Sequence, residues 1–256
     1  MALRADVREL LTAATHVLLD VDGVLCLGDQ PLADASDVVA ALSAFAPVVV
    51  TTNDSRRGPA AQRARVTAAG VPPDLAIVAA ADAVLAQLRA MGVTRITVVG
   101  TDGLRDHLDA QGLSVEALHG RRGGVSAPTV VVGCVPDPAA IDASAIAGAI
   151  GARPWLATNA DLVVPTPDGP IPDTGAVLAR IGPLVGRPPL VAGKPAASMT
   201  AAVSALVGHL GRPIVVGDGE ATDLAWARAN GWPSVHVSPR DCGGDITVAT
   251  LLDLFG

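Results

Sequence analysis

The sequence has 256 residues, half of them apolar, and a formal net charge of −7 at neutral pH. This length suits one large domain or a core with a smaller partner, and the apolar half is enough to bury a sizeable interior. Aromatic residues make up only 2% of the chain, so few rings are present to stack on a base. An acidic chain does not attract nucleic acid or an anionic membrane as a whole, and we expect neither as a partner.

The chain start and the cysteines bear on where the protein resides. Residues 1–10 are charged and contain no apolar signal core, and no run of 18 apolar residues predicts a transmembrane helix. Cys26, Cys134 and Cys242 are odd in number and widely spaced, so they match neither a disulfide framework nor a metal site. We therefore expect reduced, mostly buried thiols in a cytoplasmic protein.

Short apolar runs alternate with Ala-rich segments along the first part of the chain. We expect strands at Val17–Asp20, Pro47–Thr52, Leu75–Val78 and Arg95–Val99, and helices at Asp34–Phe45, Gly58–Ala69, Ala80–Met91 and Leu104–Gln111. Strands that are nearly continuous in Val and Ile, separated by helices, are typical of a parallel sheet that is covered on both faces.

The middle of the chain is less regular, and its end returns to the first pattern. His119–Pro128 predicts a loop, and Asp161–Asp173, with four prolines, predicts a hairpin or turn-rich loop. We expect further strands at Thr129–Gly133, Trp155–Thr158, Leu190–Ala192, Ile214–Gly217 and Ser234–Val237, and helices at Ala139–Ile150, Gly175–Val185, Ala196–Leu210, Thr222–Asn230 and Ile246–Leu254. The pattern predicts an α/β protein without internal repeats.

Two carboxylates follow one another at the end of the first predicted strand. Asp20 and Asp22 are two positions apart, so their side chains point to the same side, at the sheet edge where open α/β folds bind ligands. Two close carboxylates repel, so they need a shared proton or a cation, and Mg²⁺ prefers such oxygen ligands. Taken alone, the pattern is also that of a common turn or helix cap.

Thr52 and Asn53 follow the second predicted strand. A hydroxyl and exposed backbone N–H groups at a strand end, ahead of a helix, suit a phosphate oxygen. The alternative is an ordinary helix N-cap, for which Thr and Asn are both favoured.

Two later strand ends carry a lysine and two acids. Lys194 lies where a fixed ammonium would neutralise both a phosphate and an aspartate nucleophile, although a lysine on a surface loop is usually just solvated. Asp218 lies between two glycines and would complete a Mg²⁺ site with Asp20, while Asp223 would orient it from behind. Four strand ends thus deliver paired acids, a hydroxyl, a lysine and an acid, an inventory that fits aspartyl-phosphate chemistry.

In this order, the motifs resemble those of the haloacid dehalogenase superfamily of phosphatases. Asp20–Leu25 is similar to the first family motif, Thr52-Asn53 to the second, Gly193-Lys194-Pro195 to the third and Gly217–Asp223 to the fourth. The long gap between the second and third motifs leaves room for a cap. Within that gap, Ala157–Asp161 resembles the NagD-like, type IIA group.

The resemblance implies a Rossmann-like parallel-sheet core with an inserted α/β cap. We place the catalytic core at 1–79 and 188–256 and the C2-type cap, which would set substrate specificity, at 80–187. The implied activity is Mg²⁺-dependent hydrolysis of a small phosphomonoester such as a sugar, polyol or nucleoside phosphate. Caps of this group often mediate dimers, so a homodimer through the cap is one arrangement, and the oligomeric state stays open.

The resemblance also implies residue roles. Asp20 attacks phosphorus to form a phosphoaspartate, and Asp22 protonates the leaving oxygen and then activates water. Mg²⁺ is held by Asp20, Asp218 and the main-chain carbonyl of Asp22. The other implied roles are phosphoryl binding by Thr52, Lys194 and the main chain near Asn53, substrate binding by Asn159 and Asp161, and orientation of the metal site by Asp223.

The chain departs from the family pattern at three places without losing a catalytic group. Asp54 stands where a further Asn is common, Gly219-Glu220-Ala221 stands where Asn or Arg is common after the metal Asp, and Asp173 replaces a Gly of the cap segment. A carboxylate at Asp54 would repel phosphate unless it points away. The cap loop Leu162–Pro165 is apolar and offers no charge to an anionic leaving group, although its side chains would equally serve to pack the cap.

Three other functions compete with this reading. A signalling receiver domain also uses acids, Thr and Lys around a phosphoaspartate, but it is roughly half this length. A carbon–halogen hydrolase needs neither Mg²⁺ nor an acid at Asp22. A non-catalytic phosphate-binding protein would not need the full set of catalytic positions.

Overall fold

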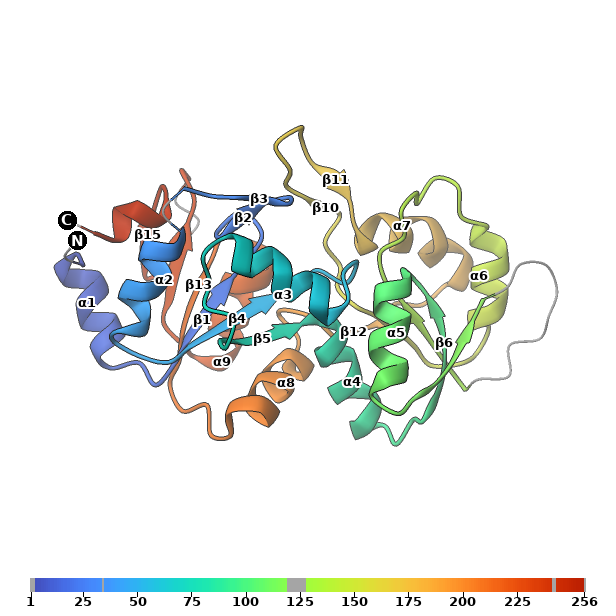
Figure 1. The fold of residues 1–256 in the computed structure, drawn as a ribbon. Helices are drawn as coiled ribbons and strands as arrows, with labels where there is room; N and C mark the ends of the chain where they lie inside the picture. The colour runs from blue at the N-terminus through green and yellow to red at the C-terminus, as the bar shows by residue number, and fades with distance from the viewer. Residues whose placement is uncertain (1–2, 34, 119–127, 241–242, 256) are drawn as a thin grey trace.

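The computed structural model describes residues 3–33, 35–118, 128–240 and 243–255. Figure 1 shows two lobes, each built on a parallel sheet, with the two chain ends side by side on the first lobe. The fold is therefore α/β, as the sequence predicts. None of the helices in the described ranges has the length and apolar character that a membrane span requires.

The first sheet has six parallel strands in the order β15-β14-β13-β1-β4-β5. They are β1 (Val17–Asp20), β4 (Val48–Thr52), β5 (Ala76–Ala79), β13 (Ile214–Gly217), β14 (Ser234–Val237) and β15 (Ile246–Val248). Side chains alternate along β1, so Val17 and Leu19 pack on one face and Leu18 on the other. Both faces are apolar because both are covered by helices.

The helices of the first lobe form two layers. The face with Val17 and Leu19 is covered by α1 (Ala5–Thr12), α2 (Ala35–Ser43), α3 (Pro59–Ala68) and the 3₁₀ turn η2 (Leu251–Leu254). The face with Leu18 is covered by α4 (Ala80–Ala90), α8 (Ala197–Val207) and α9 (Ala225–Asn230), which follows the π-helical turn η1 (Glu220–Leu224).

The second sheet has five parallel strands in the order β12-β9-β8-β6-β7. They are β6 (Arg95–Val99), β7 (Ser114–Ala117), β8 (Thr129–Val132), β9 (Trp155–Ala157) and β12 (Leu190–Val191). One face packs on α4 and α5 (Asp102–Ala110), and the other on α6 (Ala143–Ile150) and α7 (Thr174–Val185). The apolar cluster to which α4 contributes contains residues of both sheets. One apolar core therefore continues through both lobes.

Two short antiparallel hairpins lie outside the sheets. They are β2 (Cys26–Leu27) with β3 (Gln30–Pro31), and β10 (Val163–Val164) with β11 (Ile171–Pro172). In Figure 1 the β10–β11 hairpin rises between the lobes, and the backbone N–H of Gly28 donates to the carbonyl of Pro165 at 3.1 Å. The two hairpins therefore meet above the carboxyl edge of the first sheet.

The helix expected at Ile246–Leu254 is wrong. Ile246–Val248 forms the edge strand β15, because β-branched residues there pair with the free edge of β14, and only a 3₁₀ turn follows. The helix expected from Ala139 begins only at Ala143, since the Asp142 side chain accepts the N–H of Ala145 and caps it there. The sequence patterns also did not predict helix α1 or strands β2, β3 and β7.

The remaining expected strands and helices are found to within a few residues. Cys26 and Cys134 are buried free thiols, as expected. Most of the loop expected at His119–Pro128, together with Cys242, lies outside the described residues.

Candidate active site

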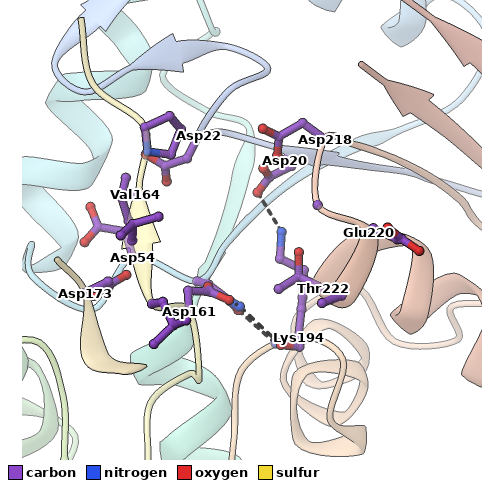
Figure 2. A pocket seen from close by; sticks show the side chains of 16 residues that line it. Asp20, Asp22, Asp54, Asp161, Val164, Asp173, Lys194, Asp218, Glu220 and Thr222 are labelled. Atoms are coloured by element: carbon purple, nitrogen blue, oxygen red, sulfur yellow. Dashed lines mark hydrogen bonds and ion pairs between the residues drawn. The ribbon is translucent and has the colours of Figure 1, made fainter. Parts of the chain in front are cut away.

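Three neighbouring strands deliver the candidate residues to one sheet edge. β13, β1 and β4 are adjacent and parallel, so the residues at their carboxyl ends, Asp218, Asp20 and Thr52, come together. Figure 2 shows Asp20, Asp218 and Lys194 facing one another across the floor of a pocket of about 310 Å³. The opposite wall is the cap loop Leu162–Pro165.

Lys194 is the only lysine in the sequence, and it lies in this floor. Its Nζ donates to Asp20 Oδ1 at 2.6 Å and to Asp223 Oδ1 at 2.7 Å. Burial disfavours its charged form, but these two carboxylates outweigh burial and raise the pKa of Lys194 above its usual value. The side chain is 2% exposed, so the ammonium is held rigidly against Asp20.

Three carboxylates surround that one ammonium. Oxygen atoms of Asp20, Asp218 and Asp223 lie within 4.8 Å of one another. Burial, followed by the charge of Asp223, raises the pKa of Asp20 well above its usual range and that of Asp218 to about 7. With all three carboxylates ionised, two negative charges would exceed the single ammonium, and a hard divalent cation with oxygen ligands relieves such an excess. The donor set therefore fits a Mg²⁺ ion.

The turn after β1 brings Gly23 against this cluster. Gly23 has φ +78°, and a Cβ there would lie 2.0 Å from Asp218 Oδ2. A side chain at this position would displace the carboxylate, so the chain requires glycine. Because Asp22 precedes this turn, its carboxylate lies outside the three-carboxylate cluster.

Asp22 has a different set of partners. Thr52 Oγ1 donates to its Oδ2 at 3.2 Å, and Arg65 Nη2 donates to its Oδ1 at 2.7 Å. The Asp22 side chain is 16% exposed and lines the pocket. Thr52 is fully buried and also accepts the N–H of Asp54, so its hydroxyl is shared between the first and second motifs.

Asn53, Asn159 and Asp161 form a buried bridge between the lobes. Asn53 Oδ1 accepts the N–H of Lys194 at 2.8 Å, and its Nδ2 donates to Asp161 Oδ2 at 2.9 Å. Asn159 is fully buried, and its Nδ2 donates to the carbonyl of Asn53 at 2.7 Å. In this arrangement Asn53 and Asp161 line the pocket, whereas Asn159 does not.

Asp54 is buried and surrounded by arginines. Its carboxylate pairs with Arg56 at 3.2 Å and with Arg57, and Arg65 Nη1 lies 3.7 Å away. Burial raises its pKa, but Arg56 and Arg57 outweigh burial and lower it overall. The neighbouring arginines therefore neutralise the carboxylate. The repulsion of phosphate that we expected from the sequence is offset in this way.

The cap side of the pocket is apolar and acidic. Leu162 and Val163 are 63% and 51% exposed, and they line the pocket together with the acidic side chains of Asp161 and Glu220. Among the described residues that line the pocket, Lys194 is the only basic one. An anionic leaving group therefore has no cation to meet on this wall.

Arg65 was not predicted as a site residue. It lies in α3, more than 40 positions after Asp22, within a helix whose pattern predicts only packing. Its side chain is 3% exposed, and Nε donates to the carbonyl of Gly28 at 2.8 Å. A basic residue on the buried face of an amphipathic helix is the one signal that would have found it.

Comparison with known families supports the reading of the motifs. Residues 17–114 match the model of the haloacid dehalogenase-like hydrolases, and residues 191–239 match that of a related family described as HAD-hydrolase-like. The two matches contain all four motifs.

Several known proteins are similar along most of the chain. The D-glycerol 3-phosphate phosphatase of Mycobacterium tuberculosis is 32% identical over 86% of this chain, which spans 62% of that protein's length. Solved structures of the mycobacterial glycerol phosphate phosphatase, with calcium and with magnesium, include one with a TM-score of 0.80 that is 26% identical and covers 98% of this chain and 76% of that one.

The 5′-nucleotidase YutF of Bacillus subtilis is 28% identical over 81% of this chain and 80% of its own length. The structure of a 4-nitrophenylphosphatase from Thermotoga maritima has a TM-score of 0.80, is 25% identical and covers 96% of this chain and 97% of that one. A solved structure whose description assigns it to NagD is 25% identical, covers 93% of this chain and 96% of that one, and has a TM-score of 0.79. The chain therefore belongs to the haloacid dehalogenase-like hydrolases, as a NagD-like member of that family.

Proposed function

We propose that this protein is a Mg²⁺-dependent phosphomonoester hydrolase that works through a phosphoaspartate on Asp20. The observation that carries this proposal is the buried Asp20 carboxylate, 2.6 Å from Lys194 Nζ, at a sheet edge with two further carboxylates. A rigid ammonium stabilises the negative charge that develops when a carboxylate attacks a phosphate. The phosphatase relatives described above support the same activity.

Each step uses residues that already line the pocket. Asp20 attacks phosphorus, the bond from phosphorus to the ester oxygen breaks, and Asp22 gives its proton to that oxygen. Water then attacks the phosphoaspartate, its proton passes to Asp22, and inorganic phosphate and free Asp20 are restored. Lys194 holds a phosphoryl oxygen throughout, while the cap loop excludes bulk water.

The proposed Mg²⁺ would be held by the carboxylates of Asp20 and Asp218 and the main-chain carbonyl of Asp22. When bound, it would offset the excess negative charge of the acidic cluster and polarise the phosphoryl oxygens. Asp223 binds Lys194 and the N–H of Gly219, so we assign it the role of orienting this floor. The magnesium found in the mycobacterial relative supports this choice of ion.

We also propose that the substrate has a small, uncharged leaving group, such as a polyol, sugar or nucleoside. The exposed Leu162 and Val163 and the carboxylates of Asp161 and Glu220 favour a neutral group, because a second anion there would be repelled. Glycerol 3-phosphate should exceed 3-phosphoglycerate in kcat/KM by at least about 10-fold. Equal values for the two esters would contradict this assignment.

The predicted division into a catalytic core, 1–79 and 188–256, and a cap, 80–187, remains a proposal. Its support is that each range is dominated by one of the two sheets. β12 pairs with β9 of the second sheet, so the connection back to the core runs along the cap before it reaches Lys194.

The test is phosphate release from p-nitrophenyl phosphate and from a panel of small phosphate esters, with Mg²⁺ and with EDTA. We expect turnover of the wild type that requires Mg²⁺ and that falls by at least about 10³-fold in Asp20→Asn. Asp37→Asn, an exposed aspartate in α2, is the matched control and should keep full activity. A folded wild type that is silent on every ester would overturn the proposal and favour a phosphate-binding role.

A further inference from the structure

A continuous chain of hydrogen bonds connects the cap hairpin with Asp22. The carbonyl of Pro165 accepts the N–H of Gly28 at 3.1 Å, and the carbonyl of Gly28 accepts Arg65 Nε at 2.8 Å. Arg65 Nη2 then donates to Asp22 Oδ1 at 2.7 Å. Three connections thus link the loop that faces the leaving group to the carboxylate proposed to protonate it.

We propose that Arg65 is the positioning residue that aims Asp22 at the leaving oxygen and ties that aim to the position of the β10–β11 hairpin. This inference rests on the proposed function, since it assigns how one of its steps is controlled. Arg65 itself lies behind Asp22 and does not line the pocket, so it acts through Asp22 rather than on the substrate.

The geometry fixes the carboxylate from two sides. Thr52 holds Oδ2 and Arg65 holds Oδ1, so rotation of the Asp22 side chain would break two hydrogen bonds, one of them charge-assisted. Each carboxylate oxygen keeps a lone pair, and the side chain remains 16% exposed toward the pocket. Asp22 is therefore oriented without being closed off from the substrate.

Arginine is required because one side chain must reach two acceptors at once. The guanidinium is a planar fork, and its Nε and Nη2 donate to Gly28 and Asp22 respectively. Lysine has a single ammonium and would satisfy one acceptor well. Gly28 in turn has φ +58°, and a Cβ there would lie 3.3 Å from Thr166 and Pro167 of the β10–β11 turn, so a larger residue would crowd the contact between the two hairpins.

A loss of aim at Asp22 has a recognisable kinetic signature. An alkyl phosphate has a poor leaving group that must be protonated as its bond to phosphorus breaks, whereas p-nitrophenolate leaves without that help. The ratio kcat/KM reports steps up to transfer of the phosphoryl group to Asp20. A defect in positioning Asp22 should therefore reduce kcat/KM for the alkyl ester far more than for the aryl ester.

The experiment compares wild type, Arg65→Met, Arg65→Lys and Arg63→Met on glycerol 3-phosphate and p-nitrophenyl phosphate. For Arg65→Met we expect a loss of about 100-fold on the alkyl ester and less than about 5-fold on the aryl ester, the same direction of bias that the proposed role of Asp22 predicts for Asp22→Asn. Arg65→Lys should recover part of the alkyl activity. Arg63→Met is the matched control in the same helix; its Nη1 donates to the carbonyl of Leu75, and it should match the wild type.

Gly28→Ala tests the connection to the hairpin. Its added Cβ lies against Thr166, so we expect the same bias against the alkyl ester, at about 10-fold, with little change for the aryl ester. Unbiased kinetics in this variant would show that Arg65 acts on Asp22 independently of the hairpin, and the second half of the proposal would be wrong.

Equal losses on both esters in Arg65→Met, or a rise in KM alone, would overturn the positioning role and leave a structural one. If Arg65→Met fails to fold, Arg65→Lys keeps the charge and supplies the same comparison. Failure of the proposed function would be seen in the activity of the wild type and of Asp20→Asn. This inference is tested only by how each variant changes the ratio of kcat/KM between the two esters.

Discussion

Asp54 illustrates how a carboxylate can lie beside the proposed phosphate site without opposing it. Its side chain is fully buried and is paired with Arg56 and Arg57, with Arg65 close by. The paired charges cost desolvation, so the group is no simple source of stability, but removing Asp54 takes the ion-pair partner of Arg56 and one of the two partners of Arg57.

We predict that Asp54→Asn lowers the free energy of unfolding by about 3–5 kcal/mol, because three guanidinium groups lose their shared anion. Urea denaturation of the wild type and the variant at pH 7 measures this change in the free energy of unfolding. The matched control is Asp29→Asn, since Asp29 also pairs with Arg57 but is 80% exposed. Its loss should stay below about 1 kcal/mol. Similar losses in the two variants would mean that Asp54 contributes no more than a surface ion pair.

At the level of residues, the sequence identified the groups that meet at the sheet edge. Asp20, Asp218 and Lys194 could be predicted because strand ends of a parallel sheet meet at one edge, and the motifs mark those ends. Arg65 could not be predicted, because its contact with Asp22 depends on how α3 lies over the sheet. The bridging contacts of Asn53 likewise depend on where the cap returns to the core.

Helix α7 begins at an unusual N-cap. Asp173 Oδ1 accepts the N–H of Thr174 at 2.8 Å, while Oδ2 is buried without a hydrogen-bond partner among the described residues. Burial raises the pKa of Asp173 to about 6, and the nearby charge of Arg56 offsets only part of that effect. This helix start is therefore more stable with a protonated cap.

The pH dependence has a definite sign. Because the pKa of Asp173 is raised in the folded state, its protonated form stabilises the fold at low pH, and that contribution is lost as pH rises from about 4 to about 6. We predict that Asp173→Asn gains about 1.4 kcal/mol relative to the wild type when urea denaturation at pH 7.5 is compared with that at pH 5. A difference that does not change with pH would contradict the raised pKa.

The buried strands and the amphipathic helices could be predicted from the sequence, whereas the short strands at the sheet edges could not. Buried strands such as β1 and β13 stand out as apolar runs between helices. β15 and β7 are short edge strands, and their few residues form strands only because a neighbouring strand offers free N–H and C=O groups. Such pairing depends on tertiary structure, so local sequence patterns do not predict it.

The two lobes share one apolar core. Leu88 of α4 is fully buried in the cluster that contains Leu18 of the first sheet and Ile96 of the second. Around it, the buried polar bridge through Asn53 adds direct hydrogen bonds between the lobes. We therefore expect the cap and the core to unfold as one cooperative unit rather than as separate domains.

Leu88→Ala should lower the free energy of unfolding by about 2–5 kcal/mol while the transition stays single. Trp155 reports the second sheet, whereas Trp226 and Trp232 report the first lobe, so fluorescence of Trp155→Phe and of the double variant Trp226→Phe/Trp232→Phe follows the lobes separately. Leu206→Ala, at a leucine of α8 that is 54% exposed, is the control and should cost less than about 1 kcal/mol. Separate midpoints for the two lobes would contradict a shared core.

The solitary lysine has a practical consequence. Lys194 is 2% exposed, is bound by two carboxylates and has a raised pKa, so its amine is neither accessible nor unprotonated in the folded protein. Every other basic side chain in the sequence is arginine or histidine. Acylating reagents and lysine-directed cross-linkers should therefore leave the folded chain without a modified side-chain amine, and they should mark Lys194 as soon as the site opens.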